Sequence, residues 1–154
     1  MSFDLYSQWK GLEDTKQFRF TAPTHVIRAF WEALSELKEE GGIDARRARY
    51  KRTQKVISDG VKEMGFKLYV DEALQGCIIT TIMTPTNPQF DFKYLYDFLA
   101  DRGKLIYPGK LTKADSFRIG SIGDLDENDA KELLGDLKDA LRGMKIEGPL
   151  TYNN

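Results

Sequence analysis

Apolar residues between positions 23 and 40 recur three or four residues apart, which is the spacing of one face of an α-helix. Pro23 suits the first turn of this helix, and the hydroxyl of Thr21 or Thr24 can cap it. The pair Gly41-Gly42 is expected to end it. The apolar stripe consists of Val26, Ile27, Phe30, Trp31, Leu34 and Leu37.

A second long helix is predicted from Asp44, as the N-cap, to Met64, with Gly65 as the C-terminal stop. Residues 1–22 show no sustained period, so we expect an arm with little structure of its own. This arm is nevertheless rich in large apolar side chains, which an isolated disordered tail normally lacks. We therefore expect it to lie against another surface. The side chains are those of Phe3, Leu5, Tyr6 and Trp9.

The second half of the chain alternates between strand-like and helix-like stretches. Asp91 and Asp126 are the expected N-caps of two helices, the first of which closes at Gly103. Strands are predicted over 66–70, 76–83, 104–107 and 116–122.

This order of elements favours an α+β fold, with a small sheet of about four strands, helices on one face, and two long connecting helices before it. The expected organisation is an arm over 1–22, connecting helices over 23–64 that lead toward a missing large domain, and a small C-terminal α+β domain over 65–154.

The charge balance argues against nucleic acid or a membrane as a partner. Lys and Arg number 23 against 24 Asp and Glu, which gives a net charge of −1. One basic run stands out, but acids are interspersed near it and it has no aromatic stacking platform, so a solvated helix face is the favoured interpretation. The run comprises Arg46, Arg47, Arg49, Lys51, Arg52 and Lys55.

The chain shows no signal peptide and no apolar stretch near the roughly 20 residues that span a bilayer. Its single cysteine, Cys77, sits in an apolar run and is expected to be a reduced core thiol. We therefore expect a cytoplasmic protein.

The residue types needed for several kinds of catalytic centre are missing from the sequence. One histidine, His25, and one cysteine exclude a Cys/His metal cage and a nucleophile triad that needs a second histidine. Neither a GxGxxG nor a GxxxxGK[ST] motif is present. No catalytic residues and no metal ligands are expected. His25, near a helix start, is interpreted as a capping or packing residue, and Lys110 as a solvated turn lysine.

Arg118 is the candidate binding residue that the pattern singles out. In the predicted strand, Phe117 and Ile119 face one side, whereas Ser116, Arg118 and Gly120 face the other. An arginine flanked by small residues has room for a ligand, and its guanidinium binds carboxylate or phosphonate bidentately. The alternative is a solvated arginine on an open sheet face.

Three stretches together resemble the carboxy-terminal part of the 2-aminoethylphosphonate–pyruvate transaminases. These enzymes are class V aminotransferases of fold type I, which depend on pyridoxal 5′-phosphate (PLP). The resemblance extends from about Leu5 to Leu141. The stretches are Phe18-Arg19-Phe20-Thr21-Ala22-Pro23-Thr24-His25, Ile106-Tyr107-Pro108-Gly109-Lys110-Leu111, and Ser116-Phe117-Arg118-Ile119-Gly120 running on to Gly123-Asp124.

The resemblance implies roles for two residues. Arg118 matches the family arginine that grips the acidic end of the substrate. Thr21 matches a threonine that reaches across a homodimer interface to the phosphate of the partner subunit's PLP. The family's Schiff-base lysine lies upstream of the Thr-x-Pro motif, so the resemblance gives Lys110 no such role. It implies that no PLP binds covalently to this chain.

The expected function is that of one portion of an enzyme that moves the amino group of 2-aminoethylphosphonate to pyruvate, giving phosphonoacetaldehyde and alanine. The portion alone is expected to be inactive. Two alternatives stay open. One is another class V transaminase, acting in alanine–glyoxylate or serine–pyruvate exchange. The other is a stand-alone α+β module that binds a different small anion.

Overall fold

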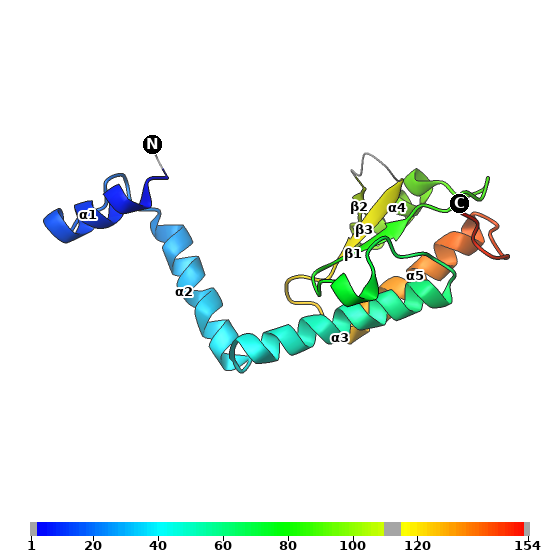
Figure 1. The fold of residues 1–154 in the computed structure, drawn as a ribbon, viewed down its shortest axis with the longest axis horizontal. Helices are drawn as coiled ribbons and strands as arrows, with labels where there is room; N and C mark the ends of the chain where they lie inside the picture. The colour runs from blue at the N-terminus through cyan, green and yellow to red at the C-terminus, as the bar shows by residue number, and fades with distance from the viewer. Residues whose placement is uncertain (1–2, 110–114, 153–154) are drawn as a thin grey trace. The chain divides into compact units, whose positions relative to one another are not determined.

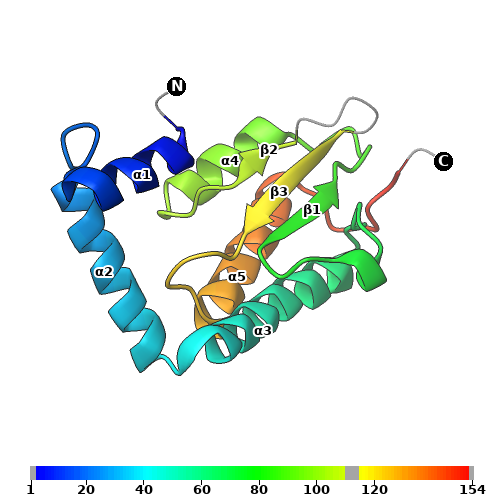
Figure 2. The same cartoon turned by 60° about the vertical axis from the view of Figure 1, so that its left-hand side comes forward.

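The computed structural model describes residues 3–109 and 115–152, which form two compact units, Met1–Ile43 and Asp44–Asn154. Figure 1 shows the order of the elements along the chain, and Figure 2 shows them after a turn of 60°. The first unit contains two helices. The second contains the sheet and the helices that pack on it.

The first unit opens with α1 (Leu5–Thr15), a helix in the stretch that we predicted to have little structure of its own. Asp4 caps it, because its carboxylate accepts hydrogen bonds from the Ser7 amide at 2.9 Å and the Ser7 hydroxyl at 2.7 Å. Lys16 ends it in the left-handed conformation, with φ 59°. The prediction was wrong because an eleven-residue helix is too short to establish a clear period.

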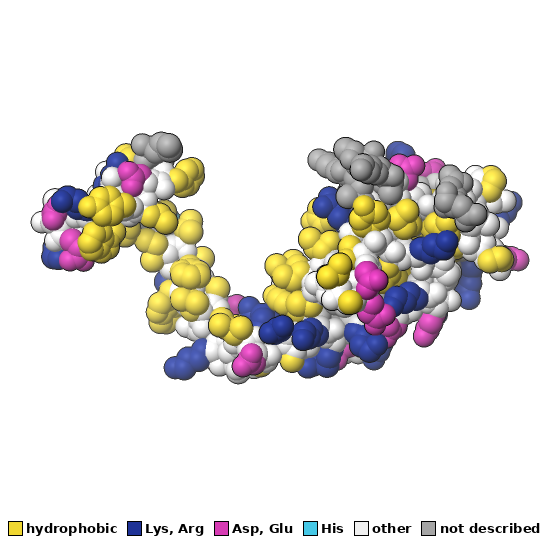
Figure 3. Space-filling model, viewed as in Figure 1, with side chains coloured by type: hydrophobic (Ala, Val, Ile, Leu, Met, Phe, Trp, Pro, Cys, Tyr) yellow, Lys and Arg dark blue, Asp and Glu magenta, His cyan; other side chains and the backbone are white. Residues whose placement is uncertain are grey.

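The second helix of this unit, α2 (Thr24–Glu39), confirms the predicted helix but not its cap. Pro23 occupies the N-cap position, and no side chain caps the helix. The predicted apolar stripe is largely exposed in this unit. Figure 3 shows hydrophobic side chains gathered along α1 and α2. The most exposed on α2 are Val26, Phe30, Trp31 and Leu34.

The long helix α3 (Gly42–Glu63) begins two residues before the predicted cap at Asp44. Gly65 stops it as predicted, with φ 88°. The Gly65 amide donates to the Lys62 carbonyl at 2.9 Å, and the Phe66 amide donates to the Val61 carbonyl at 2.9 Å. These two bonds form a Schellman motif, which satisfies carbonyls that the helix end would otherwise leave unpaired.

The sheet has three strands in the described residues, in the antiparallel order β1-β3-β2. Their bounds are β1 (Ile79–Met83), β2 (Tyr107–Pro108) and β3 (Ser116–Gly120). The predicted fourth strand over 66–70 contributes only a bridge between Leu68 and Ile82. It stops early because Asp71 caps the short 3₁₀ helix η1 (Glu72–Leu74), where the chain turns away from β1.

Helices cover one face of this sheet, which confirms the α+β class. Asp91 caps α4 (Phe92–Ala100), and Asp126 caps α5 (Glu127–Gly143) with a full capping box. Figures 1 and 2 show α3 and α5 running along one side of the strands. The core between these layers contains Ile57, Val61, Ile82, Leu95, Leu99, Phe117, Ile119, Leu133 and Leu137.

Phe117 lies at the centre of this core. It is fully buried, and its ring is 5.8 Å from that of Phe66 and 5.7 Å from that of Phe92, measured between centroids. Burial of one such side chain stabilises the fold by roughly 2–3 kcal/mol. Because side chains alternate along a strand, the burial of Phe117 fixes its neighbours Ser116 and Arg118 on the opposite face of β3.

Candidate functional site

Arg118 lies in β3, the central strand, with its side chain on the sheet face away from the helices. Phe117 is fully buried and Ile119 is 2% exposed, whereas Arg118 between them is half-buried. The structure therefore has the alternation that the sequence predicted, and it puts Ser116 and Gly120 on the face of Arg118.

Two residues of the neighbouring strands lie directly opposite Arg118. The register pairs it with Thr81 of β1 and with Tyr107 of β2. Residues directly opposite in an antiparallel pair project from the same face of the sheet. Thr81, Arg118 and Tyr107 thus form one row across the three strands. Thr81 is half-buried, and Tyr107 is 59% exposed.

The guanidinium of Arg118 is only weakly engaged by the protein. Its Nη2 donates to the Pro108 carbonyl at 3.4 Å, a long hydrogen bond. Its Nε is buried and has no hydrogen-bond partner among the described residues. In residues 3–109 and 115–152, no carboxylate pairs with this charge. Buried donors are normally satisfied, so this guanidinium nitrogen has room for an acceptor beyond the described residues.

Small residues leave space along the face of Arg118. A Cβ built on Gly120 would meet no atom within 4 Å, so the position beside the arginine stem is open. On the other side, the Ser116 hydroxyl is buried and has no hydrogen-bond partner in the part of the chain that the structure describes. The face therefore combines an open position with two unpaired polar atoms, which suits a small polar ligand better than an apolar one.

Thr21, the other predicted site residue, belongs to the first unit. It is exposed, in the segment without regular secondary structure just before α2. The Thr24 amide donates to the Ala22 carbonyl at 2.9 Å, but no side chain caps α2, which leaves the amides of His25 and Val26 for an anion. His25 is exposed in the first turn of α2, which does not support a packing role. Lys110 lies outside the described residues.

The basic run on α3 serves the fold more than we predicted. Arg49 donates from Nη1 to the carbonyls of Gly123 and Leu125, both at 2.8 Å. Arg52 pairs with Glu127 at 2.8 Å. These contacts attach α3 to the loop between β3 and α5 and to the first residue of α5. At Arg49, which is half-buried, the interpretation as a solvated face was wrong, whereas Arg52 is exposed as predicted.

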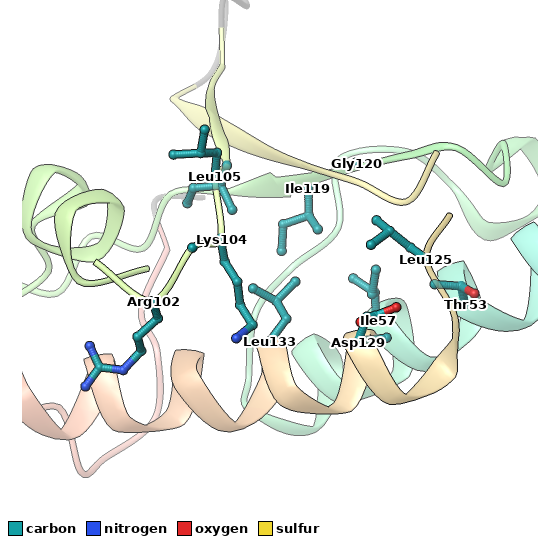
Figure 4. A pocket seen from close by; sticks show the side chains of 13 residues that line it. Thr53, Ile57, Arg102, Lys104, Leu105, Ile119, Gly120, Leu125, Asp129 and Leu133 are labelled. Atoms are coloured by element: carbon teal, nitrogen blue, oxygen red, sulfur yellow. The ribbon is translucent and has the colours of Figure 1, made fainter. Parts of the chain in front are cut away.

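A cavity of about 330 Å³ lies on the helix side of the sheet (Figure 4). The charges at its rim are already matched, because Lys104 and Arg102 both pair with Asp136, at 2.8 and 3.5 Å. The hydrogen bond that Lys104 donates to the Asp136 carboxylate raises the pKa of Lys104, so this amine stays protonated. The lining is mainly apolar and includes Ile57, Leu105, Ile106, Ile119, Leu125 and Leu133. This cavity does not resemble an anion site.

Two kinds of feature are missing from the part of the chain that the structure describes. No group of three or more His, Cys, Asp or Glu side chains is arranged to hold a metal ion. None of the described helices is long and apolar enough to cross a bilayer.

Sequence reasoning missed Tyr107 as a neighbour of Arg118. Its position depends on the pairing of β2 with β3, which residues eleven apart in the chain do not reveal. The available signal was the sequence Tyr107-Pro108-Gly109-Lys110, which belongs to one of the three stretches that resemble the family.

No family model matches the sequence. The chain is 48% identical over 143 residues to the 2-aminoethylphosphonate–pyruvate transaminase of Syntrophobacter fumaroxidans, a match that covers 92% of the chain and 38% of that protein. It is 49% identical over 137 residues to the enzyme of the same name from Lactiplantibacillus plantarum, which covers 87% of the chain and 37% of the relative. The chain thus spans less than two fifths of the length of these curated relatives.

Solved structures show the same fold. The pyridoxamine–pyruvate aminotransferase of Mesorhizobium loti superposes with a TM-score of 0.77 at 24% identity, over 94% of the chain and 37% of that structure. At this identity the likeness supports the fold alone. The sequence relatives are far closer, and their identity extends over nearly all of the chain. Over nearly all of its length the chain is therefore similar to the carboxy-terminal part of the 2-aminoethylphosphonate–pyruvate transaminases.

Proposed function

We propose that the chain is the carboxy-terminal portion of a transaminase that moves the amino group of 2-aminoethylphosphonate to pyruvate. The observation that carries this proposal is the weakly engaged guanidinium of Arg118 on the open face of the sheet, whose Nε has no partner among the described residues, in a chain 48% identical to a protein of that name. The products of the reaction are phosphonoacetaldehyde and alanine.

In this proposal Arg118 binds the acidic end of each substrate. Phosphonate and carboxylate both present two oxygens that match the guanidinium fork, so one arginine serves both half-reactions. The long bond to the Pro108 carbonyl is readily given up to a charged acceptor. Holding the acidic end fixes the distance and angle of the reacting amine, and small misplacements of that amine are costly.

Thr21 is proposed to hold the phosphate of PLP in a partner subunit. The residues present fit this group, because the exposed hydroxyl stands just before an uncapped helix start, where N–H groups favour an anion. PLP supplies the electron sink for amino-group transfer. The chain's own contribution is then one phosphate contact and one substrate clamp.

The proposal assigns the rest of the enzyme to a large domain and a second subunit. The exposed apolar side chains of α1 and α2 would pack on those parts, since a soluble protein rarely leaves such a surface bare. Residues 23–64 are the proposed connection to the large domain. The free thiol of Cys77 suits the reducing cytoplasm, where we expect the enzyme to act.

The test uses an enzyme restored to full length by joining this chain to the amino-terminal part of the Syntrophobacter fumaroxidans relative. Arg118→Lys keeps the charge but cannot form the bidentate pair. We expect kcat/KM to fall about thirty- to a thousandfold for both 2-aminoethylphosphonate and pyruvate, which corresponds to roughly 2–4 kcal/mol.

Arg142→Lys is the matched control, because Arg142 is an exposed arginine whose partner is Asp139 on the same helix. It should change kcat/KM by less than about twofold. Near-wild-type kcat/KM in Arg118→Lys for both substrates would remove Arg118 from the site. The proposed function would then lose its main support.

A further inference from the structure

Arg118 alone does not distinguish the two substrates of the proposed reaction. Its fork satisfies two oxygens, which is all that a carboxylate offers. A phosphonate has a third oxygen, which needs a donor of its own if it is not to lose the hydrogen bonds of water. Among the described residues, the side chains that share the sheet face of Arg118 are the places to look for that donor.

Tyr107 lies in the position that such a donor requires. It is directly opposite Arg118 in the β2–β3 pair, so the two Cβ atoms are roughly 4.5–5.5 Å apart and project from the same face. The side chain is 59% exposed. In residues 3–109 and 115–152 no protein group bonds to its hydroxyl, so the phenol can donate to a ligand.

The lengths of the side chains favour Tyr107 over Thr81, which flanks Arg118 on the other side. The hydroxyl of Thr81 sits on its Cβ, next to the stem of the arginine. The phenol hydroxyl stands at the end of a long rigid ring, so it reaches farther from the backbone of the sheet than the Thr81 hydroxyl does. Nη2 of Arg118 also bonds to the carbonyl of Pro108, so the guanidinium lies toward the strand of Tyr107.

We propose that Tyr107 is a specificity residue of the Arg118 site, whose phenol donates a hydrogen bond to the third oxygen of a phosphonate. This inference rests on the proposed function and adds to it the basis for telling a phosphonate from a carboxylate. A hydrogen bond to a charged acceptor is stronger than one between neutral groups. One hydroxyl is therefore enough to favour a phosphonate over a carboxylate. A carboxylate on the same guanidinium leaves the phenol in water and gains nothing from it.

The test compares two substitutions that each remove one hydroxyl beside Arg118, Tyr107→Phe and Thr81→Val, in the restored full-length enzyme. We expect Tyr107→Phe to lower kcat/KM for 2-aminoethylphosphonate about ten- to a hundredfold. For alanine, the amino donor of the reverse direction, the change should stay within about threefold. Thr81→Val should leave the ratio of the two values unchanged within about threefold.

The ratio of kcat/KM for 2-aminoethylphosphonate to kcat/KM for alanine separates a loss of phosphonate binding from damage to the fold. A structural defect lowers both kcat/KM values together and leaves their ratio unchanged. An unchanged ratio in Tyr107→Phe would overturn the inference. The inference would also be overturned if Thr81→Val changed the ratio as much as Tyr107→Phe does. If Arg118→Lys lowers both activities while Tyr107→Phe leaves the ratio alone, this inference fails and the proposed function stands. If Arg118→Lys has no effect, the proposed function fails first.

A binding measurement tests the role of Tyr107 in phosphonate binding without any enzyme activity. Methylphosphonate and acetate can be titrated into the 154-residue chain while the NMR signals of the Arg118 side chain are followed. Methylphosphonate should bind about tenfold more weakly to Tyr107→Phe than to the unmodified chain, with acetate unchanged. Equal affinities of methylphosphonate for the two chains would contradict the inference, even if the restored enzyme had no activity.

Discussion

The amide of Gly109 donates to the carbonyl of Ser116 at 2.6 Å, and a Cβ at Gly109 would fall 2.1 Å from that same oxygen. Only glycine permits this approach. The contact closes the end of β2 against β3, next to the strand pair that holds Arg118 and Tyr107 opposite each other. A close backbone contact thus helps to set the register of the candidate site.

Gly109→Ala should therefore destabilise the protein by about 1–3 kcal/mol, because a backbone atom, which cannot simply move aside, occupies the space of the new methyl group. Gly135→Ala is the control. Gly135 is exposed within α5, and no atom lies within 4 Å of the place that its new methyl group would take, so alanine should stabilise by about 0.5–1 kcal/mol. Urea unfolding measures both changes. Equal stability of the two variants would contradict the steric argument.

The tail of the chain is attached through Tyr152. Its hydroxyl accepts from the Lys67 amide at 3.1 Å and donates to the Gly65 carbonyl at 3.4 Å. Because the ring is partly exposed, Tyr152→Phe should cost only about 0.5–1 kcal/mol. Hydrogen exchange should speed up at the Lys67 amide in this variant. An unchanged exchange rate at that amide would show that the bond does not form in solution.

The same phenol gives a pH dependence with a definite sign. Burial raises the pKa of Tyr152 above its ordinary value, although the hydrogen bond from the Lys67 amide lowers it somewhat. The folded protein therefore holds this proton more tightly than the unfolded chain does. The contribution to stability is complete below about pH 10 and is lost as pH rises through the folded-state pKa. The stability difference between wild type and Tyr152→Phe should shrink over that range, whereas a constant difference would contradict the shift.

Arg49 should matter to the fold far more than its neighbour Arg47. Arg49→Gln removes the two 2.8 Å bonds to the carbonyls of Gly123 and Leu125, at an expected cost of about 1–2 kcal/mol. Arg47 is exposed, and Arg47→Gln removes the same charge at an expected cost within about 0.5 kcal/mol. Denaturant midpoints of the two variants measure the difference. Equal midpoints would show that the contacts of Arg49 do not stabilise the fold, and the interpretation of the basic run as a solvated helix face would then hold at Arg49 as well.

The isolated chain is expected to form no specific covalent bond with PLP. In the family that it resembles, the lysine that holds the cofactor lies upstream of the segment matching Thr21. Incubation with PLP, reduction with borohydride and peptide mapping should give scattered partial labelling of surface amines. Stoichiometric labelling of one lysine, Lys110 included, would contradict this expectation.

Much of the local structure was predictable because its causes are local. Asp91 and Asp126 accept bonds from amides two and three residues away, and Gly65 ends α3 through its own backbone conformation. Arg118 was predictable as an outward residue because strand alternation needs no knowledge of the partner strands. The helix α1 escaped prediction, since eleven residues with a short apolar pattern do not stand out from an irregular arm.

The sequence by itself determined the α+β class and the family resemblance, and it singled out Arg118 as the candidate for binding an anion. Only the tertiary structure decided what surrounds that residue. The row of Thr81, Arg118 and Tyr107 depends on the register of three strands that come from distant parts of the chain. The missing bond at the Arg118 Nε and the close contact at Gly109 also arise only when β2 and β3 meet. Such pairings are set by the packing of side chains remote in sequence, which no local pattern encodes.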